Sequence, residues 1–313
     1  MNSKIKGYVA GIVSAISYGL NPLGALFMYD DGMRPPSVLF YRFSLAASIL
    51  ALVMLVERKS FLLTKKEALI LLSLGILFSA SSITYYTSFQ YMDAGIACTI
   101  LFFYPVMVAV IMALFFKEKL SASTIIAIVL SLIGILMLYQ GDGNTKISTL
   151  GMALVILSSL TYAVYIIVVN KSSIRMSSIK LTMYVLIVCA IMIGSYAYLS
   201  GQPIQTIPTT RSWICAIGLA LIPTVISLVT LTIAVNNVGS TAAAIMGALE
   251  PVTAVIVGVL VFGEVITPRL ATGMVLIMGA VLLIILGKKL SPKIILASVS
   301  RKGKKLVKHW RWK

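Results

Sequence analysis

Two ionisable side chains lie deep inside long apolar runs, where a charge is costly unless it has a function or a partner. Glu250 stands directly before Pro251, about 15 Å along its run by the helical rise per residue. Arg42 lies about two turns into a second apolar run. Glu250 could bind a cationic group of a substrate, carry a coupling proton because burial favours a neutral carboxyl, or form a structural ion pair with Arg42.

Two polar stripes occupy matching positions in the first and second halves of the chain. Their spacing of i, i+3, i+4 and i+7 places each stripe on one face of a helix. The stripes consist of Ser14, Ser17, Tyr18 and Asn21, and of Ser158, Thr161, Tyr162 and Tyr165. Their larger side chains either line a substrate cavity or join helices by hydrogen bonds, as small polar residues often do in membranes. For Ser14 and Ser158 we favour helix joining.

Tyrosines and prolines extend this set of candidate ligands. Tyr85 and Tyr104 offer ring faces and hydroxyls of the kind that ligand pockets use. Pro105 and Pro251 each remove a backbone donor from an apolar helix at equivalent positions, which is typical of transporter sites. The candidate substrate-binding residues are Tyr18, Asn21, Arg42, Tyr85, Tyr104, Tyr162, Tyr165 and Glu250. Our hypothesis is that the two buried charges hold opposite ends of a zwitterionic or polar metabolite.

The sequence holds no residue cluster typical of a catalytic or metal centre. Its one histidine, His309, lies in a basic terminal segment, and Cys98, Cys189 and Cys215 are far apart within apolar runs. A conventional imidazole-rich metal site or a Ser–His triad needs more than this. No phosphate-binding loop ending in Gly-Lys-Ser/Thr is present either. We therefore expect no catalytic residue, no metal and no cofactor.

The elements that must position these residues follow from the composition. Of 313 residues, 59% are hydrophobic and 11% are charged, whereas roughly 25% are charged in a soluble protein. Soluble enzymes, DNA-binding domains and disordered chains are therefore excluded. Spanning a bilayer takes about 20 apolar residues, and helices satisfy their own backbone groups there. Helices are predicted over 5–28, 37–56, 67–89, 94–116, 121–139, 149–169, 179–199, 212–235, 240–262 and 268–287. The predicted fold class is an all-α integral membrane protein with ten transmembrane helices.

The two halves of the chain carry the same pattern. The segment 14–18 aligns with 158–162 at an offset of 144, and Pro105 aligns with Pro251 at an offset of 146. Each half holds five predicted helices, so the second half enters the membrane inverted relative to the first. The predicted units are a five-helix repeat over 1–143, its inverted copy over 144–287 and a basic amphipathic tail over 288–313.

Basic residues outnumber acidic ones by 26 to 9, and their distribution predicts an orientation. In the ten-helix layout, 21 of them fall on the side of the N-terminus and four on the other side. This bias predicts a multi-pass protein of the inner (plasma) membrane with cytoplasmic N- and C-termini. The tail holds ten of these basic residues and no acid. It either binds anionic lipid of the inner leaflet or serves as a disordered topology signal.

Two motif-bearing segments resemble a known family. Residues 95–138 contain FFYP at 102–105, KEKL at 117–120 and Gly134, and residues 239–284 contain LEPV at 249–252, GEVI at 263–266 and Gly279. Both are similar to the repeat of the EamA family of the drug/metabolite transporter superfamily. The resemblance implies a ten-helix transporter, commonly an exporter of amino acids or other small metabolites. Glu118 and Glu264, within these motifs, are interpreted as helix-end charges and not as substrate ligands.

We therefore expect a secondary transporter that exports small polar metabolites such as amino acids by alternating access around a central cavity. Proton coupling is one option for its energy source. The expected partners are a small-molecule substrate and membrane lipids, with no nucleic acid, and the sequence leaves a monomer or a homodimer open. The alternatives are a lipid translocase, whose cavity would open sideways to the bilayer, and an intramembrane enzyme acting on a lipid-linked substrate.

Overall fold

The computed structural model describes residues 3–118, 120–139, 148–172 and 176–287. Every regular element in these ranges is helical. Ten helical stretches are long and apolar enough to cross a membrane, which confirms the predicted fold class. The first five spans are formed by α1 (Ser3–Gly19) with α2 (Asn21–Asp30), α3 (Pro35–Val56), α4 (Lys65–Ser88), α5 (Ala94–Leu101) with α6 (Tyr104–Phe116), and α7 (Ala122–Tyr139). The second five are formed by α8 (Thr149–Lys171), α9 (Ser178–Leu199), α10 (Thr210–Ala220) with η1 (Leu221–Ile226) and α11 (Ser227–Val238), α12 (Ser240–Gly247) with α13 (Leu249–Phe262), and α14 (Pro268–Gly287).

Three spans that the sequence predicted as continuous helices are interrupted near their middle. The first breaks at Leu20, the fourth at Phe102 and Phe103, and the ninth at Ala248. In each case a proline occupies the first turn after the break. The helix is interrupted there because the proline ring and its missing N–H prevent the preceding helix from continuing through it. The eighth span remains continuous but widens into the π-helix η1 around its own proline.

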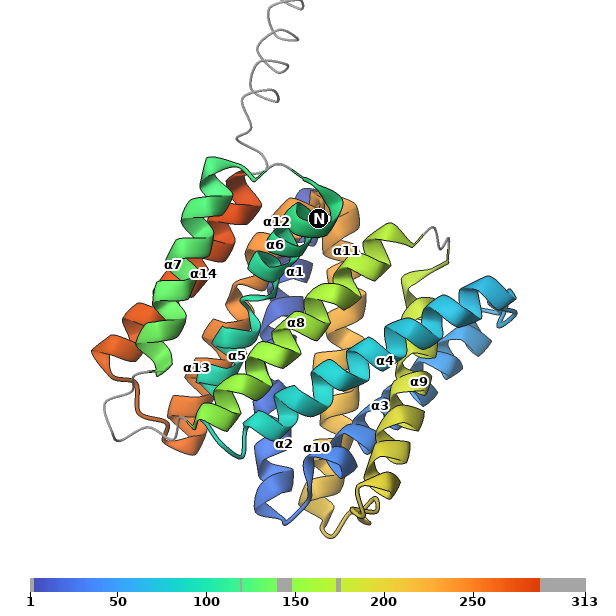
Figure 1. The fold of residues 1–313 in the computed structure, drawn as a ribbon. Helices are drawn as coiled ribbons and strands as arrows, with labels where there is room; N and C mark the ends of the chain where they lie inside the picture. Colours follow the sequence, from blue (N-terminus) through green and yellow to red (C-terminus); the bar gives the residue numbers. More distant parts are fainter. Residues whose placement is uncertain (1–2, 119, 140–147, 173–175, 288–313) are drawn as a thin grey trace, which may run out of the picture.

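The packing of the spans has the two-fold pattern of an internal repeat. In the repeat, α1 corresponds to α8, and α11 corresponds to α4. The pair α1 and α11 is in extensive contact, and so is the equivalent pair α8 and α4. The spans that correspond to each other also pack together, as α3 does on α9, α7 on α14 and α5 on α13. Figure 1 shows α7 and α14 side by side at one edge of the bundle. The predicted architecture of two five-helix repeats therefore agrees with the arrangement in space.

Hydrogen bonds between helices repeat in the same way. Ser14 and Ser227 bond each other's carbonyl oxygens, at 2.8 and 3.1 Å, and their hydroxyls lie 3.2 Å apart. Ser158 and Ser81, at the equivalent positions, form the same reciprocal pair at 2.7 and 3.0 Å. All four serines are buried. The interpretation of Ser14 and Ser158 as helix-joining residues is thus confirmed.

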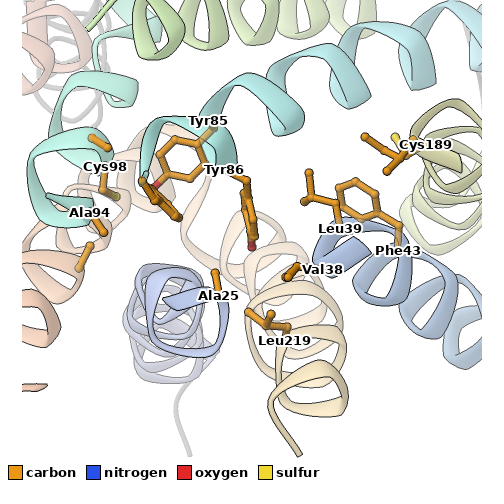
Figure 2. Close-up of a cluster of buried hydrophobic side chains, with 14 of the residues drawn as sticks. Ala25, Val38, Leu39, Phe43, Tyr85, Tyr86, Ala94, Cys98, Cys189 and Leu219 are labelled. Carbon is orange, nitrogen blue, oxygen red and sulfur yellow. The ribbon is translucent and has the colours of Figure 1, made fainter. Parts of the chain in front are cut away.

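The larger hydrophobic core lies where α2, α3, α4, α9 and α10 meet. Figure 2 shows part of it, with Val38, Leu39 and Phe43 of α3 facing side chains of neighbouring helices. Because the number of spans is even, Ser3 and Gly287 lie at the same end of the bundle (Figure 1). We call this end the terminal face and the other end the opposite face. The tail over 288–313 and its expected contact with lipid lie outside the described residues.

Candidate functional site

Proline at two of the irregular positions frees a carbonyl that a nearby polar side chain then binds. Pro22 has no N–H to offer the carbonyl of Tyr18, and the Asn21 amide donates to that oxygen instead at 2.8 Å. Pro223 likewise leaves the carbonyl of Leu219 free, and the Thr224 hydroxyl donates to it at 3.0 Å. The local sequence therefore fixes both polar side chains at the places where the helices depart from regular geometry.

Arg42 is held by these same groups. Its Nε donates to the Thr224 hydroxyl at 3.1 Å, and its Nη1 donates to the Tyr86 hydroxyl at 2.6 Å. The Tyr86 hydroxyl in turn donates to Oδ1 of Asn21 at 3.2 Å. The rings of Phe43 and Tyr86 each have their centroid 5.5 Å from the guanidinium carbon. With only 4% of its surface exposed, Arg42 is stabilised by neutral hydrogen-bond acceptors and aromatic rings.

Arg42 and Glu250 do not form an ion pair. The ion pairs of the described residues include Lys59 with Glu57 and Arg211 with Asp31, and neither Arg42 nor Glu250 takes part in one. In the same part of the chain, no side chain donates a hydrogen bond to the Glu250 carboxyl group. The structural ion pair, one of the three roles considered for Glu250, is therefore not formed in this conformation.

Glu250 lies where the broken first and ninth spans meet. A Cβ atom added at Gly19 would lie 2.6 Å from the Glu250 carbonyl oxygen, so the two backbones touch at this point. Glu250 is partly exposed, and Tyr18, Tyr104 and Tyr162 lie near it. Tyr18 also lies near Arg42, so it neighbours both buried charges.

Aromatic rings form one continuous cluster beside Glu250. The rings of Tyr104 and Tyr162 meet edge to face with their centroids 4.7 Å apart, and the rings of Tyr162 and Tyr165 are stacked at 5.7 Å. Phe78 of α4 contacts Tyr165 at 5.3 Å and Tyr162 at 6.2 Å. All four rings are partly exposed although they lie in the interior of the bundle.

Tyr85 is placed apart from this cluster. Its ring packs against Phe89 at 4.7 Å, and its hydroxyl faces the Cys98 thiol (Figure 2). Its neighbour Tyr86 points away from it, toward α2 and α3, and makes the hydrogen bonds to Arg42 and Asn21. Seven of the eight candidate residues thus gather in the Arg42 network or around Glu250, and the buried Tyr85 adjoins the network through its ring contact with Tyr86 at 5.9 Å.

Three residues of this region were not among the candidates: Phe78, Tyr86 and Thr224. Pro223 was a signal for Thr224, because an intramembrane proline frees a carbonyl that a neighbouring hydroxyl can satisfy. Phe78 carries no comparable signal, since it is one of many apolar residues in its span.

A second polar cluster closes the opposite face. Asp31, after α2, pairs with Arg211 of α10 and accepts hydrogen bonds from the hydroxyls of Thr209 and Ser212 at 2.7 and 2.6 Å. The hydrogen bonds from Arg211, Ser212 and Thr209 hold the pKa of the Asp31 carboxyl well below its ordinary value. Nearby, Gln205 joins the same two loops through the Gly32 carbonyl and the backbone N–H of Arg34. We call Asp31, Gln205, Thr209, Arg211 and Ser212 the latch.

Glu264 lies between α13 and α14 and caps the first turn of α5. Its carboxylate accepts hydrogen bonds from the backbone N–H groups of Ala94 at 2.8 Å and Gly95 at 3.2 Å. Burial raises the pKa of Glu264, and these two hydrogen bonds oppose the effect. Glu264 thus stabilises a helix end, as interpreted from the sequence.

Three comparisons with known proteins bear on this chain. A model of the EamA-like transporter family matches residues 5–140 and 149–286. An uncharacterized transporter of Archaeoglobus fulgidus is 26% identical over 213 residues, which cover 68% of this chain and 75% of that protein. The uncharacterized transporter YcbK of Bacillus subtilis is 23% identical over 300 residues, covering 91% and 94%. A solved crystal structure with 16% identity superposes with a TM-score of 0.65 over 92% of this chain and 99% of the other, and so shares the fold.

Proposed function

Because the chain belongs to the EamA-like transporter family, we propose that this membrane transporter is a secondary exporter of small polar metabolites, working by alternating access and coupled to protons through Glu250. One observation carries the proposal. Glu250 is a partly exposed carboxyl inside the bundle that no described side chain neutralises. A group of this kind can bind a cation or a proton in turn, which is the exchange that a coupled exporter needs.

The loops at the two ends of the bundle support alternating access. Tyr41 donates to the Gln205 carbonyl at 3.1 Å on the opposite face, and Tyr184 donates to the Phe61 carbonyl at 2.5 Å on the terminal face. The two tyrosines occupy equivalent places in the two repeats, so each end has the same tie between a helix and the loop of the other repeat. The latch is an additional closure of the opposite face. In the part of the chain that the structure describes, the opposite face is therefore held by more contacts than the terminal face. Such a difference between two equivalent ends is expected of a protein that opens its two ends alternately.

We further propose that the terminal face is cytoplasmic and that the protein resides in the inner (plasma) membrane. The excess of basic residues on that side of the membrane supports this orientation. Single-cysteine labelling tests it: Ser200→Cys should react with an impermeant maleimide added to intact cells, and Ser60→Cys should react only after permeabilisation. The reverse pattern would contradict the orientation.

The lipid translocase is the second candidate function, and one observation favours it. An apolar groove of about 380 Å³ lies between α3 and α9 and is lined by Phe40, Ser44, Ala47, Ser48, Ala51, Ile187, Ala190 and Ile191. None of these residues belongs to the Arg42 network or to the cluster around Glu250. The groove therefore suits an acyl chain on the membrane surface of the protein.

Transport into inverted vesicles tests the proposed function. In an inverted vesicle, export from the cell becomes uptake into the vesicle. Vesicles with the wild-type protein should therefore accumulate one or more labelled amino acids when a pH gradient is imposed across their membrane. Glu250→Gln should lower the initial rate about tenfold or more, because a neutral amide cannot exchange a proton for a cation. Glu57→Gln, in an exposed loop ion pair, is the matched control and should leave the rate unchanged. An unchanged rate and pH dependence in Glu250→Gln would overturn the role of Glu250.

A further inference from the structure

The repeat gives each residue around the site an equivalent in the other half, and the members of a pair differ in chemistry. Tyr104 and Glu250 both stand directly before the proline that follows a helix break. Phe78 lies three residues before Ser81, as Thr224 lies three before Ser227. The equivalent pairs are Phe78 with Thr224, Tyr104 with Glu250, Tyr162 with Tyr18, and Tyr165 with Asn21.

These pairs separate into two walls. We call Phe78, Tyr104, Tyr162 and Tyr165 the aromatic wall, and Thr224, Glu250, Tyr18 and Asn21 the polar wall. The walls are adjacent: Phe78 of the aromatic wall contacts the ring of Phe43 at 5.9 Å, which lies beside the Arg42 guanidinium that binds Thr224 of the polar wall. Tyr104 and Tyr162 also lie near Tyr18 and Glu250. A two-fold repeat with identical halves would present the same chemistry on both sides. Here the substitutions make the site one-sided, so a substrate has one preferred orientation.

We infer that the substrate is a small organic amine with a flat apolar group, bound with its cationic nitrogen at Glu250 and its flat group on the aromatic wall. This inference rests on the proposed transport function and names the substrate class of the same site. An ammonium gains from a carboxylate and from the faces of nearby rings at once. A flat group gains from stacking and edge-to-face contacts with the ring cluster.

On the polar wall, Glu250 is the charged group that no described side chain binds. The Asn21 amide already binds the Tyr18 carbonyl and the Tyr86 hydroxyl. The Thr224 hydroxyl already donates to the Leu219 carbonyl and accepts from Arg42. The carboxyl group of Glu250 therefore makes the polar wall select a positively charged group of the substrate.

The same geometry disfavours a carboxylate on the substrate. The guanidinium of Arg42 donates to Thr224 and Tyr86, and the rings of Phe43 and Tyr86 lie beside it. Its 4% exposure leaves little surface for a further partner. In an amino acid the carboxylate is on the carbon that carries the ammonium, so it would lie beside the Glu250 carboxylate, which repels it. An amine should therefore bind better than the corresponding amino acid.

Calorimetric titration of the purified full-length protein in detergent at neutral pH tests this inference. The four probes are 2-phenylethylamine, 2-cyclohexylethylamine, phenylalanine and 3-phenylpropionate. Relative to 2-phenylethylamine, the second replaces the aromatic ring with a saturated one, the third adds a carboxylate, and the fourth replaces the amine with a carboxylate. We expect 2-phenylethylamine to bind about tenfold or more tightly than each of the other three. Glu250→Gln should weaken its binding about tenfold or more.

The aromatic wall is tested by Tyr162→Leu. This variant should lower the preference for 2-phenylethylamine over 2-cyclohexylethylamine to about threefold or less, and change the affinity for 2-cyclohexylethylamine by about twofold at most. Tyr196→Leu, at a tyrosine that is 50% exposed on the outside of α9, is the matched control and should retain the wild-type preference. If Tyr162→Leu does not fold, Tyr165→Leu replaces it.

Several results would overturn the inference: equal affinities for 2-phenylethylamine and phenylalanine, equal affinities for the two amines, or no binding of any probe. Transport of another solute without a preference for the aromatic amine would overturn the inference and leave the transport function standing. Binding of 2-phenylethylamine as expected, without transport of any solute in reconstituted vesicles, would instead overturn the proposed function and leave the binding site standing.

Discussion

Ser14 and Ser227 exchange hydrogen bonds across α1 and α11, each hydroxyl donating to the carbonyl of the other residue. The equivalent pair of Ser158 and Ser81 has the same geometry across α8 and α4. Two serines can bond each other's carbonyl groups only where the two helix backbones approach closely. The two pairs therefore fix the same helix crossing in both repeats. The repeat is thus preserved in the helix contacts even where the site residues have diverged.

Ser14→Ala and Ser158→Ala should destabilise the protein by similar amounts, about 1 kcal/mol each, since each removes a reciprocal hydrogen-bonded contact inside the membrane. Unfolding by increasing mole fractions of a denaturing detergent would measure both losses. Ser48→Ala is the control, because the Ser48 hydroxyl bonds only the Ser44 carbonyl of its own helix. Losses in the first two variants no larger than in this control would contradict the helix-joining role.

The latch should make stability depend on pH through Asp31. Its folded-state pKa is lowered, so the ionised latch stabilises the protein above the ordinary pKa of an aspartate, about 3.9, and this contribution is lost as the pH falls below that value. Asp31→Asn should therefore unfold at a lower temperature than the wild type at pH 7, and the difference should shrink below about pH 4. Thermal unfolding across this pH range measures it.

Asp30→Asn is the matched control for the latch, because Asp30 is the exposed neighbour of Asp31 and accepts none of the latch hydrogen bonds. Its unfolding temperature should follow the wild type over the whole pH range. A difference between the wild type and Asp31→Asn that is the same at pH 7 and at pH 3 would show that the Asp31 charge does not hold the latch.

Glu264 and Gly258 should behave as one unit. A Cβ added at Gly258 would lie 2.1 Å from Oε2 of Glu264, so Gly258→Ala must displace the carboxylate that caps α5. Glu264→Gln weakens the same cap, because its amide presents a donor to one of the two backbone N–H groups. Each change should cost about 1–2 kcal/mol of unfolding free energy, and the double variant should cost less than the sum. Full additivity in a detergent unfolding assay would contradict this coupling.

Two glycines of α14 should respond differently to alanine. A Cβ at Gly273 would lie 2.9 Å from the backbone oxygen of Gly134, where α7 and α14 cross, whereas a Cβ at Gly279 has no atom within 4 Å. Gly273→Ala should therefore separate the two helices and lower the unfolding temperature, and Gly279→Ala should leave it unchanged or raise it slightly. In α14 the family motif noted in the sequence contains Gly279, but the glycine that packs closely against α7 is Gly273. Equal unfolding temperatures for the two variants would contradict the assignment.

Thr224→Val should disrupt the Arg42 network more than Thr224→Ser. Valine has nearly the shape of threonine but cannot accept from Arg42 or donate to the Leu219 carbonyl, whereas serine keeps the hydroxyl. The valine variant should lose about 1–3 kcal/mol of stability, and the serine variant less than half of that. Comparison of their unfolding midpoints provides the measurement, and equal midpoints would show that the hydroxyl is not needed.

The sequence by itself determined the spans, the repeat and the family. Ten runs of apolar residues must become helices because a bilayer offers no partner to an unpaired backbone group. The repeat was visible because segments such as 14–18 and 158–162 must make the same helix contacts in both halves. The gathering of Tyr18, Tyr162 and Glu250 was also anticipated, since polar groups in hydrocarbon are placed where they face the bundle interior.

Only the tertiary structure decided which of these residues meet. Sequence spacing relates positions within one helix, and it cannot show that Arg42 would bind Tyr86 and Thr224 from two other spans and leave Glu250 unpaired. The division of the site into an aromatic and a polar wall also depends on packing, because equivalent positions lie about 145 residues apart in the chain and only the fold brings their helices together.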